Sequence, residues 1–323
     1  MKKEDLKIIF MGTPEFAVET LSSLVDNGYN VVAVVTQPDK PVGRHGSVLC
    51  PSDVKKYAVE HNIPVLQPVK MKDPEFLEAL KKFEADLQVV VAFRMLPEVV
   101  WAMPRFGTFN VHAALLPQYR GAAPINWAVI NGETRTGVTT FFLDHDIDTG
   151  RIIMQEPFEI KDDYNVEDVY DGLMHLGAGI CLKTIEKIIE GNGSVESLPQ
   201  EEMIDAGTVL HDAPKIFKET CRIDWNKSCK EIYDFIRGLS PYPGAWTEMT
   251  DEEGKTCVLK IYEAEKTDVA SVSAVGSTVV EKHNFAVCAA DKMLRLKAVQ
   301  QQGKKRMSAD DFANGLHSAI TLK

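Results

Sequence analysis

The sequence predicts an α/β fold in which a mostly parallel sheet is followed by a small β-barrel. In the first 190 residues, short apolar runs alternate with segments of helical periodicity, an order that indicates parallel strands joined by right-handed crossovers. Later, short alternating strands follow one another with turn residues between them, which is typical of a barrel. A polar stretch, 194–213, separates the two patterns. We expect a Rossmann-like domain over residues 1–208, with its linker from about residue 194, and a barrel domain over residues 209–323.

The bulk composition is that of a globular protein of one large or two domains. The 323 residues are 45% hydrophobic and 26% charged. No apolar run approaches the roughly 20 residues that span a bilayer. The N-terminus lacks the apolar region and cleavage site of a signal peptide, so a cytoplasmic location is expected.

The cysteines and histidines argue against a metal centre. The six cysteines are widely separated and form no CxxC pair, so reduced and mostly buried thiols are expected. Apart from His112, the histidines form no pair with metal-ligand spacing.

The net charge of −11 argues against indiscriminate nucleic-acid binding, but the charge is unevenly spread. Residues 1–208 carry 19 Lys and Arg against 31 Asp and Glu, a net charge of −12. Residues 209–323 carry 17 against 16, a net charge of +1. The C-terminal part is therefore far less repulsive to a phosphate backbone.

The first strand–helix–strand unit does not favour a nicotinamide dehydrogenase. Strands are expected at Leu6–Met11 and Tyr29–Thr36. Between them, Thr13 fits an N-cap and Pro14 the first position of a helix that runs to about Asn27. Gly12 stands alone after the first strand, no GxGxxG is present, and no acidic residue closes the second strand.

A long loop and several regular elements follow. Residues 37–52 are too long for a simple strand–helix connection, and long loops in compact domains tend to be functional. Further helices are expected at 52–61, 74–82, 163–190 (with an Asn165 cap) and 228–237 (with a Ser228–Glu231 capping box). Further strands are expected at 63–66, 87–92, 151–160, 258–263, 278–280, 286–289 and 294–298.

Residues 106–151 hold most of the recognisable chemistry. Phe109–His112 alternates as the end of a strand does, so Asn110 and His112 point the same way. Pro117 makes the following turn extended, and Pro124 is placed to open a helix. A second strand, Gly137–Leu143, leads into an acidic loop closed by a glycine.

Asn110 offers an amide, His112 a proton carrier, and Asp148 a carboxylate able to hold the imidazole. No Ser or Cys stands beside the histidine in this stretch, which favours direct transfer between two substrates over a covalent intermediate. The same residues also fit a core-capping asparagine, a buried histidine and a solvated acidic turn, and spacing alone does not choose between the two interpretations. The aspartate run fails as an EF-hand, because Thr149 and Gln155 occupy the positions that need Gly and Glu.

This stretch resembles the formyltransferases that use 10-formyltetrahydrofolate, whose pattern is NxHxSLLPxxRGxxP followed by a DTG-containing loop. The matching residues are Asn110, His112, Leu115, Leu116, Pro117, Arg120, Gly121, Pro124 and Asp148–Gly150. The resemblance implies that Asn110, His112 and Asp148 are catalytic. It further implies a folate site with contacts from Phe93, Met95, Leu96, Ala114, Leu115, Leu116, Pro117 and Asp144. Two departures in this stretch are Ala114 for a serine and His145-Asp146 for small residues ahead of the final aspartate. In the segment that resembles the family's folate pocket, Arg94 stands in place of a glycine.

Two further segments resemble the methionyl-tRNA formyltransferase branch of this family. The loop motif KPxGR, with Lys40 and Arg44, resembles an insertion that reaches into the tRNA acceptor end. Residues 214–225 resemble the beginning of that branch's C-terminal domain, which implies an OB-like barrel that binds tRNA. Lys304, Lys305 and Arg306 alone fit a solvated turn or a nucleic-acid contact; the resemblance favours tRNA.

The resemblance implies formyl transfer from 10-formyltetrahydrofolate, as co-substrate, to the α-amine of methionyl initiator tRNA. Neither a metal nor NAD is expected, and a monomer without membrane contact is expected. The alternatives are a formyltransferase acting on an amino sugar nucleotide, which should lack KPxGR, and a tRNA-binding protein with a decayed site. The smaller glycinamide ribonucleotide enzyme is disfavoured by the length of the chain.

Overall fold

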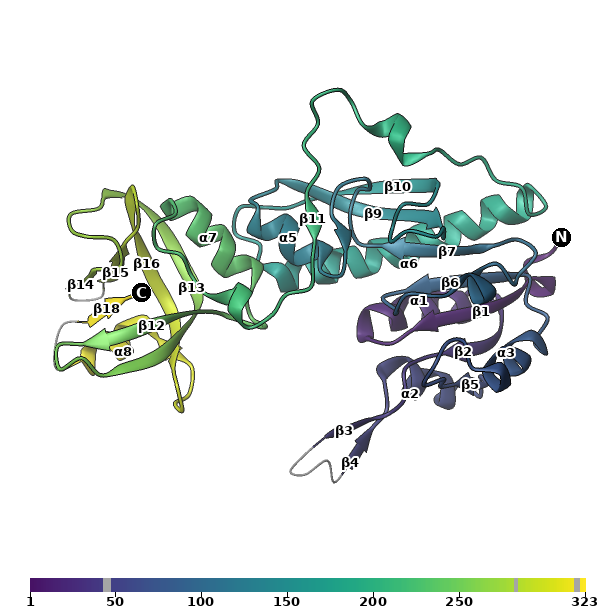
Figure 1. Cartoon of the computed structure of the whole chain (residues 1–323), viewed down its shortest axis with the longest axis horizontal. Coiled ribbons are helices and arrows are strands. Elements are labelled where there is room, and N and C mark those ends of the chain that lie inside the picture. The colour runs from purple at the N-terminus through teal and green to yellow at the C-terminus, as the bar shows by residue number, and fades with distance from the viewer. Residues whose placement is uncertain (43–47, 282–283, 317–319) are drawn as a thin grey trace. The chain divides into compact units, whose positions relative to one another are not determined.

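The computed structural model describes residues 1–42, 48–281, 284–316 and 320–323, and Figure 1 labels most of its helices and strands. The described residues form two compact units with interleaved segments. Unit 1 comprises Met1–Gly121, Thr136–Glu159 and Tyr170–Asp212, and unit 2 comprises Ala122–Arg135, Ile160–Val169 and Ala213–Lys323. The expected domain boundary between residues 208 and 209 stays a prediction.

Unit 1 is built on a seven-stranded sheet with the order β10-β9-β7-β6-β1-β2-β5. Neighbouring strands from β7 to β5 are parallel, and β9 runs antiparallel to β7. This confirms the mostly parallel, Rossmann-like sheet. The strands are β1 (Lys7–Gly12), β2 (Asn30–Val35), β5 (Val65–Leu66), β6 (Leu87–Val91), β7 (Thr108–His112), β9 (Arg135–Phe142) and β10 (Ile152–Glu159).

Of the two caps predicted for the helices that accompany this sheet, Asn165 is present and Thr13 is not. Ser52 accepts from the Lys55 amide at the start of α2, and Asn165 accepts from two amides at the start of α6. The Thr13 cap is wrong: Pro14 is the N-cap of α1, since its φ of −81° and ψ of 172° place the helix start one residue later. The helices are α1 (Glu15–Asp26), α2 (Asp53–Glu60), α3 (Pro74–Lys81), α4 (Glu98–Trp101) and α6 (Val166–Glu190).

The long segment 37–52 is not a plain loop. It contains an antiparallel hairpin of β3 (Lys40–Val42) and β4 (Val48–Cys50), which projects from unit 1 (Figure 1). At its base, Asp39 accepts from Lys55 Nζ at 2.7 Å and from Gln67 Nε2 at 2.8 Å. A short hairpin with prolines at its flanks carries too weak an alternation to be read from sequence.

Unit 2 contains a nearly closed antiparallel barrel with the strand order β14-β15-β16-β13-β12-β18, and β17 pairs with β16. A bridge between Ser277 and Thr321 brings the two ends of this order together. The strands are β12 (Ala245–Asp251), β13 (Thr256–Ala270), β14 (Thr278–Glu281), β15 (Asn284–Cys288), β16 (Lys292–Gln301), β17 (Met307–Ser308) and β18 (Ile320–Leu322). The helices are α5 (Pro124–Ile130), α7 (Cys229–Gly238) and α8 (Ala309–Asn314), and β8 (Arg120–Gly121) pairs with β11 (Asp212–Ala213).

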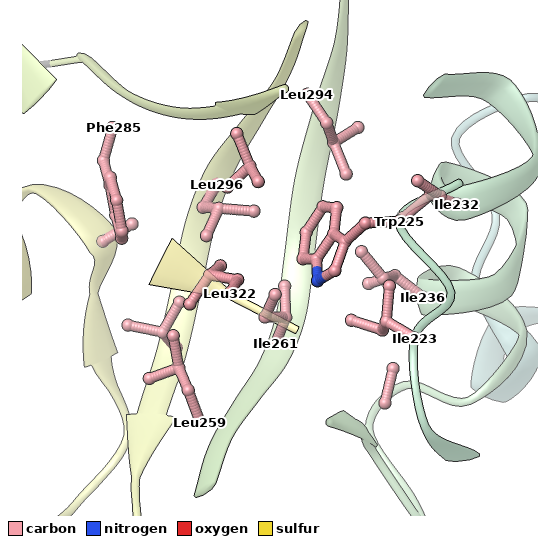
Figure 2. Packing of buried hydrophobic residues seen from close by; sticks show 14 of the residues in the cluster. Ile223, Trp225, Ile232, Ile236, Leu259, Ile261, Phe285, Leu294, Leu296 and Leu322 are labelled. Atoms are coloured by element: carbon pink, nitrogen blue, oxygen red, sulfur yellow. The ribbon is translucent and has the colours of Figure 1, made fainter. Parts of the chain in front are cut away.

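The barrel core packs against one face of α7. Figure 2 shows Trp225 between Ile261 of β13 and Ile232 and Ile236 of α7, and all four side chains are buried. Trp225 donates its Nε1 hydrogen to Thr247 Oγ1 at 3.0 Å, which satisfies its one polar group. The Ser228–Glu231 capping box at the start of α7 is present as predicted.

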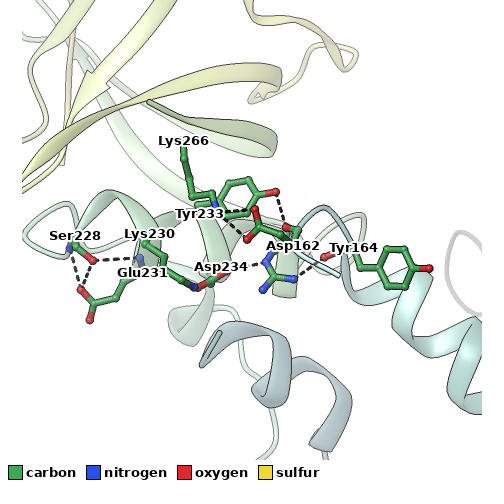
Figure 3. A network of polar contacts seen from close by, with 9 residues as sticks. Asp162, Tyr164, Ser228, Lys230, Glu231, Tyr233, Asp234 and Lys266 are labelled. Atoms are coloured by element: carbon green, nitrogen blue, oxygen red, sulfur yellow. Dashed lines mark hydrogen bonds and ion pairs between the residues drawn. The ribbon is translucent and has the colours of Figure 1, made fainter. Parts of the chain in front are cut away.

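A polar network fastens the segment 160–169 to α7 within unit 2 (Figure 3). Lys266 Nζ pairs with the Asp162 carboxylate at 2.7 Å, and the Tyr233 hydroxyl donates to the Asp162 carbonyl at 2.9 Å. Deeper in the network, Arg237 donates to the Asp234 carboxylate and to the Tyr164 carbonyl, each at 2.8 Å. Asp234 and Arg237 are buried, and the Asp234 carboxylate also pairs with Lys230 Nζ at 2.5 Å. The buried charge of Arg237 is therefore compensated by a carboxylate that two cations share.

The thiols are free, and most are buried, as the composition predicts. Cys181, Cys221, Cys229 and Cys288 are buried, whereas Cys50 is exposed on β4. None of the described helices combines the length and apolar composition that crossing a membrane requires.

Candidate active site

β7 carries Asn110 and His112 to the carboxyl edge of the parallel strands, where open α/β sheets bind ligands. Asn110 lies opposite Val90 of β6 and Phe141 of β9, and His112 lies opposite Thr139 of β9. The Oδ1 atom of Asn110 is buried and has no hydrogen-bond partner among the described residues. A buried acceptor oxygen without a donor fits an N–H or O–H group of a bound substrate.

Protein atoms face both ring nitrogens of His112. Its Nε2 lies 2.9 Å from the Tyr119 carbonyl, which can only accept, so the proton of this pair is on Nε2. Its Nδ1 lies 3.8 Å from Asp148 Oδ2. The side chain of His112 is only 6% exposed. The ring is therefore fixed in plane, and a protonated ring would direct its second N–H toward the carboxylate.

Asp148 is held in a tight loop. Its φ of 55° lies in the left-handed region, and its Oδ2 accepts from the Gly121 amide at 2.9 Å. Two residues later, a Cβ on Gly150 would lie 1.7 Å from the Phe142 carbonyl oxygen, so only glycine fits. The loop thus needs a residue tolerant of positive φ and then a glycine, which explains the sequence Asp148-Thr149-Gly150.

The turn after His112 is anchored to the neighbouring strands. Thr139 Oγ1 donates to the Ala114 carbonyl at 2.7 Å and accepts from the Leu116 amide at 3.1 Å. Gln155 Nε2 donates to the Leu116 carbonyl at 2.7 Å. Ala114 is fully buried, so its methyl group faces the protein interior. Of the predicted folate contacts in this turn, Leu115 alone is half-buried, since Leu116 and Pro117 are also buried.

The segment after β6 is the second expected wall of the folate site. Phe93 and Leu96 pack in one cluster with Leu143, and Met95 is 67% exposed. Arg94 has a structural explanation: its guanidinium donates to the carbonyls of Pro68 and Val69, the latter at 3.0 Å. It therefore ties this segment to the chain that follows β5.

Asp144 lies at the exposed start of the acidic loop, and its Oδ1 accepts from the amide of His145 at 2.7 Å. Of the three aspartates in the loop, only Asp148 lies within ion-pair distance of His112. The described residues contain no group of three or more His, Cys, Asp or Glu that could hold a metal ion.

Gln200 is a site residue that the sequence interpretation missed. Its Nε2 donates to the backbone carbonyls of Asp148 and Gly150, both at 2.8 Å, and it is fully buried. It lies in the polar stretch assigned to a linker, where a glutamine gives no signal of burial.

The predicted tRNA contacts differ in their surroundings. Lys40, on β3, and both Lys304 and Lys305 are exposed. Arg306 pairs with Glu263 and lies 4.6 Å from the centre of the Tyr262 ring. Arg44 lies outside the described residues.

The arrangement of Asn110, His112 and Asp148 at the end of β7 suits a reaction in which one substrate oxygen becomes negative and a proton is transferred beside it. The His112 ring contacts a carbonyl, a carboxylate and the ring of Phe141, rather than a hydroxyl or thiol of the described chain. It therefore activates none of the described Ser or Cys side chains as a nucleophile.

Comparison with known proteins agrees with this geometry. The family model "Formyl transferase" matches residues 6–185, and "Formyl transferase, C-terminal domain" matches residues 215–317. A methionyl-tRNA formyltransferase of Parabacteroides distasonis is 60% identical over 316 residues, 98% of this chain and 97% of the relative. One of Bacteroides fragilis is 58% identical over 324 residues, 100% of this chain and 99% of the relative.

A solved structure also shares the fold. An N-formyltransferase from Helicobacter canadensis, in complex with folinic acid and dTDP-3-aminofucose, matches with a TM-score of 0.62 and 21% identity over 92% of this chain and 99% of that one. The family models together match most of the chain, and the relatives match nearly all of it. The chain belongs to the formyl transferase family.

Proposed function

We propose that this chain transfers the formyl group of 10-formyltetrahydrofolate to the α-amine of methionine esterified to initiator tRNA. The observation that carries the proposal is the approach of Asp148 to His112, two residues from Asn110, at the end of β7. The relatives that are 58–60% identical over nearly the whole chain carry the name of this activity, which supports the choice of acceptor.

The reaction needs an amine in its free-base form, and an α-amine with a pKa of about 7.7–8.0 is partly so at neutral pH. Its nitrogen attacks the formyl carbon and gives a tetrahedral intermediate with a negative oxygen. The bond from that carbon to the folate nitrogen then breaks. The amine nitrogen loses one proton and the folate nitrogen gains one, so charge and protons balance.

In this proposal Asn110 donates to the negative oxygen, and the positive charge of protonated His112 stabilises it. The proton that His112 carries is the one on Nδ1, because Nε2 is hydrogen-bonded to the Tyr119 carbonyl and Nδ1 lies 3.8 Å from Asp148 without a hydrogen bond. Asp148 compensates the charge of the imidazolium at 3.8 Å. One preorganised donor to such an oxygen contributes about 10²–10³-fold in rate. Nδ2 of Asn110 is the donor in this role, and its buried, unpartnered Oδ1 is an acceptor that the attacking amine can satisfy.

The folate would lie between the two segments that follow β6 and β7. Met95 and Phe93 offer apolar surface in the first segment, and Leu115 offers it in the second. Ala114 would contribute only through its backbone, because its side chain is fully buried. Folate-type ligands bound to structural relatives of this fold support the class of co-substrate.

For tRNA, the proposed contacts are Lys40, Arg44, Lys304, Lys305 and Arg306. Lys304 and Lys305 are exposed and follow β16, where they can reach a phosphate backbone. Phosphate contacts of this kind position an acceptor rather than read its bases. A monomer is proposed.

The second candidate is formyl transfer to an amino sugar nucleotide. It is favoured by the fold shared with the enzyme from Helicobacter canadensis, although at 21% identity that likeness shows the fold alone. The third hypothesis is a tRNA-binding protein that has lost its catalytic activity, and the presence of Asn110, His112 and Asp148 argues against it.

The test is a formylation assay with 10-formyltetrahydrofolate that compares methionyl initiator tRNA with an amino sugar nucleotide at several salt concentrations. We expect formylation of the tRNA with a KM that rises with salt, because phosphate contacts release counterions. The variant Lys304→Ala/Lys305→Ala should raise KM and flatten this salt dependence. Transfer to the sugar alone would contradict the proposed acceptor, and transfer to neither would contradict the activity.

A further inference from the structure

Gln200 is the one buried residue between Ile188 and Ala213, although apolar residues surround it in sequence. Leu198 is 49% exposed and Val209 is 69% exposed, while Gln200 is fully buried. Burial of a glutamine in place of nearby leucine and valine is not driven by the hydrophobic effect. The side chain must be held inside by its polar contacts.

Those contacts use the complete hydrogen-bonding capacity of the Gln200 amide. The two N–H groups of Nε2 donate to the carbonyls of Asp148 and Gly150. The Oε1 atom accepts from Arg120 Nε at 3.0 Å and from Arg120 Nη2 at 2.6 Å. A side chain with two donors and two lone pairs satisfies all four here.

The contacts of Gln200 and Arg120 form a closed chain of residues that includes Asp148, the proposed catalytic carboxylate. Arg120 is adjacent to Gly121, whose amide donates to Asp148 Oδ2, and Gln200 holds the backbone carbonyl of the same aspartate. Asp148 is thus fixed through its side chain from one direction and through its main chain from another. Because its φ of 55° is unfavourable for a non-glycine residue, this conformation needs such external support.

The same polar stretch also contacts the turn that holds His112. The Tyr119 amide donates to the His211 carbonyl at 2.7 Å, and the Tyr119 carbonyl is the partner of His112 Nε2. Gln118 exchanges two hydrogen bonds with the stretch, one to the Val209 carbonyl and one from the His211 amide, each at 2.9 Å. Asp148 and Tyr119, the two residues that face the imidazole nitrogens, are therefore both hydrogen-bonded to residues of the stretch 200–211.

We propose that Gln200 is a positioning residue for the reaction: through the Asp148–Gly150 backbone and Arg120 it sets the carboxylate that faces His112. The proposal rests on the proposed function for its rate readout. It makes the stretch 200–211 part of the active site rather than a passive connection. Gln200 itself touches neither substrate nor reacting atoms in this scheme.

The variants Gln200→Glu and Gln200→Leu separate its two sets of contacts. Glutamate keeps the volume and an acceptor for Arg120 but removes both donors, and it places a carboxylate against two carbonyl oxygens. Leucine removes every polar contact. Thr184→Val is the matched control, because Thr184 is also a fully buried, hydrogen-bonded polar residue of unit 1, and its partners are Thr140 and Ile180.

We expect both Gln200 variants to lower kcat, by up to about 100-fold, since a misplacement on the scale of 1 Å can cost that much. KM for the tRNA should change little, and Thr184→Val should keep the wild-type kcat. Hydrogen–deuterium exchange of the amides in 144–150 should accelerate in both Gln200 variants and not in Thr184→Val. A merely structural role would instead lower stability in all three variants without this pattern.

Wild-type kcat in Gln200→Glu, or unchanged exchange in 144–150, would overturn the positioning role. If the wild-type protein formylates neither acceptor, the proposed function fails, and the exchange experiment still decides whether Gln200 holds the Asp148 loop. The two failures are therefore distinguishable.

Discussion

His112 Nδ1 and Asp148 Oδ2 are 3.8 Å apart, within the range of an ion pair but beyond that of a hydrogen bond. The same carboxylate oxygen accepts a hydrogen bond from the Gly121 amide at 2.9 Å. In the proposed reaction the carboxylate therefore acts on the imidazole through its charge, while the hydrogen bond to the Tyr119 carbonyl orients the ring.

This division of labour predicts different effects for the two residues. His112→Ala should lower kcat by about 10²–10⁴-fold, because it removes both the proton carrier and the positive charge. Asp148→Asn should lower kcat less, since the asparagine can still accept from Gly121. Steady-state kinetics with circular dichroism as a folding control would check this. Near-normal kcat in His112→Ala would sink the assignment.

Gly150→Ala should destabilise the protein by about 1–3 kcal/mol, the usual cost of forcing atoms into a packed site. The added Cβ would lie 1.7 Å from the Phe142 carbonyl oxygen, so the backbone must move. Gly179→Ala is the control: it lies in α6 with nothing within 4 Å of the added Cβ, and it should stabilise by about 0.5–1 kcal/mol. Urea unfolding measures both, and equal effects would contradict the argument.

Asp234→Ala should destabilise the protein by about 3–5 kcal/mol, because it leaves Arg237 buried without its carboxylate. The matched control is Asp268→Ala, which breaks an ion pair with Lys292 at a fully exposed aspartate and should cost little. Thermal and urea unfolding of the two variants would compare them. A cost for Asp234→Ala as small as that of the control would show that the buried pair is dispensable.

Thiol labelling should follow burial. Cys50 is exposed on β4 and should react first with iodoacetamide in the native protein. Cys181 should react last, because full burial raises the pKa of its thiol far above neutrality and also blocks access. Mass spectrometry of partly labelled protein gives the order, and early labelling of Cys181 would indicate that α6 opens in the native state.

Local patterns were sufficient to predict most of the fold. The capping box of α7, the prolines and the apolar alternation place α2, α3, α7 and the central strands within one to three residues, since these signals act over a single turn of chain. β18 was missed because its three residues have meaning only against β12, some 70 residues earlier. Pairing of that kind leaves no local trace.

The site shows the same limit. Strand alternation predicts that the side chains of Asn110 and His112 point the same way. The family resemblance predicts that Asp148 lies close to them. Arg94 and Gln200 could not be interpreted, because their partners are backbone carbonyls far away in the sequence. A carbonyl is present at every residue, so sequence cannot say which one a side chain will meet.

The interleaving of the two units limits how the chain can be divided. The barrel core is extended by Ile130 of α5, and Arg237 of α7 depends on the Tyr164 carbonyl, yet both partners are encoded before residue 208. A fragment that starts at the linker would leave these positions empty. Any exchange of the barrel between catalytic domains would therefore have to carry two short upstream segments, 122–135 and 160–169, with it.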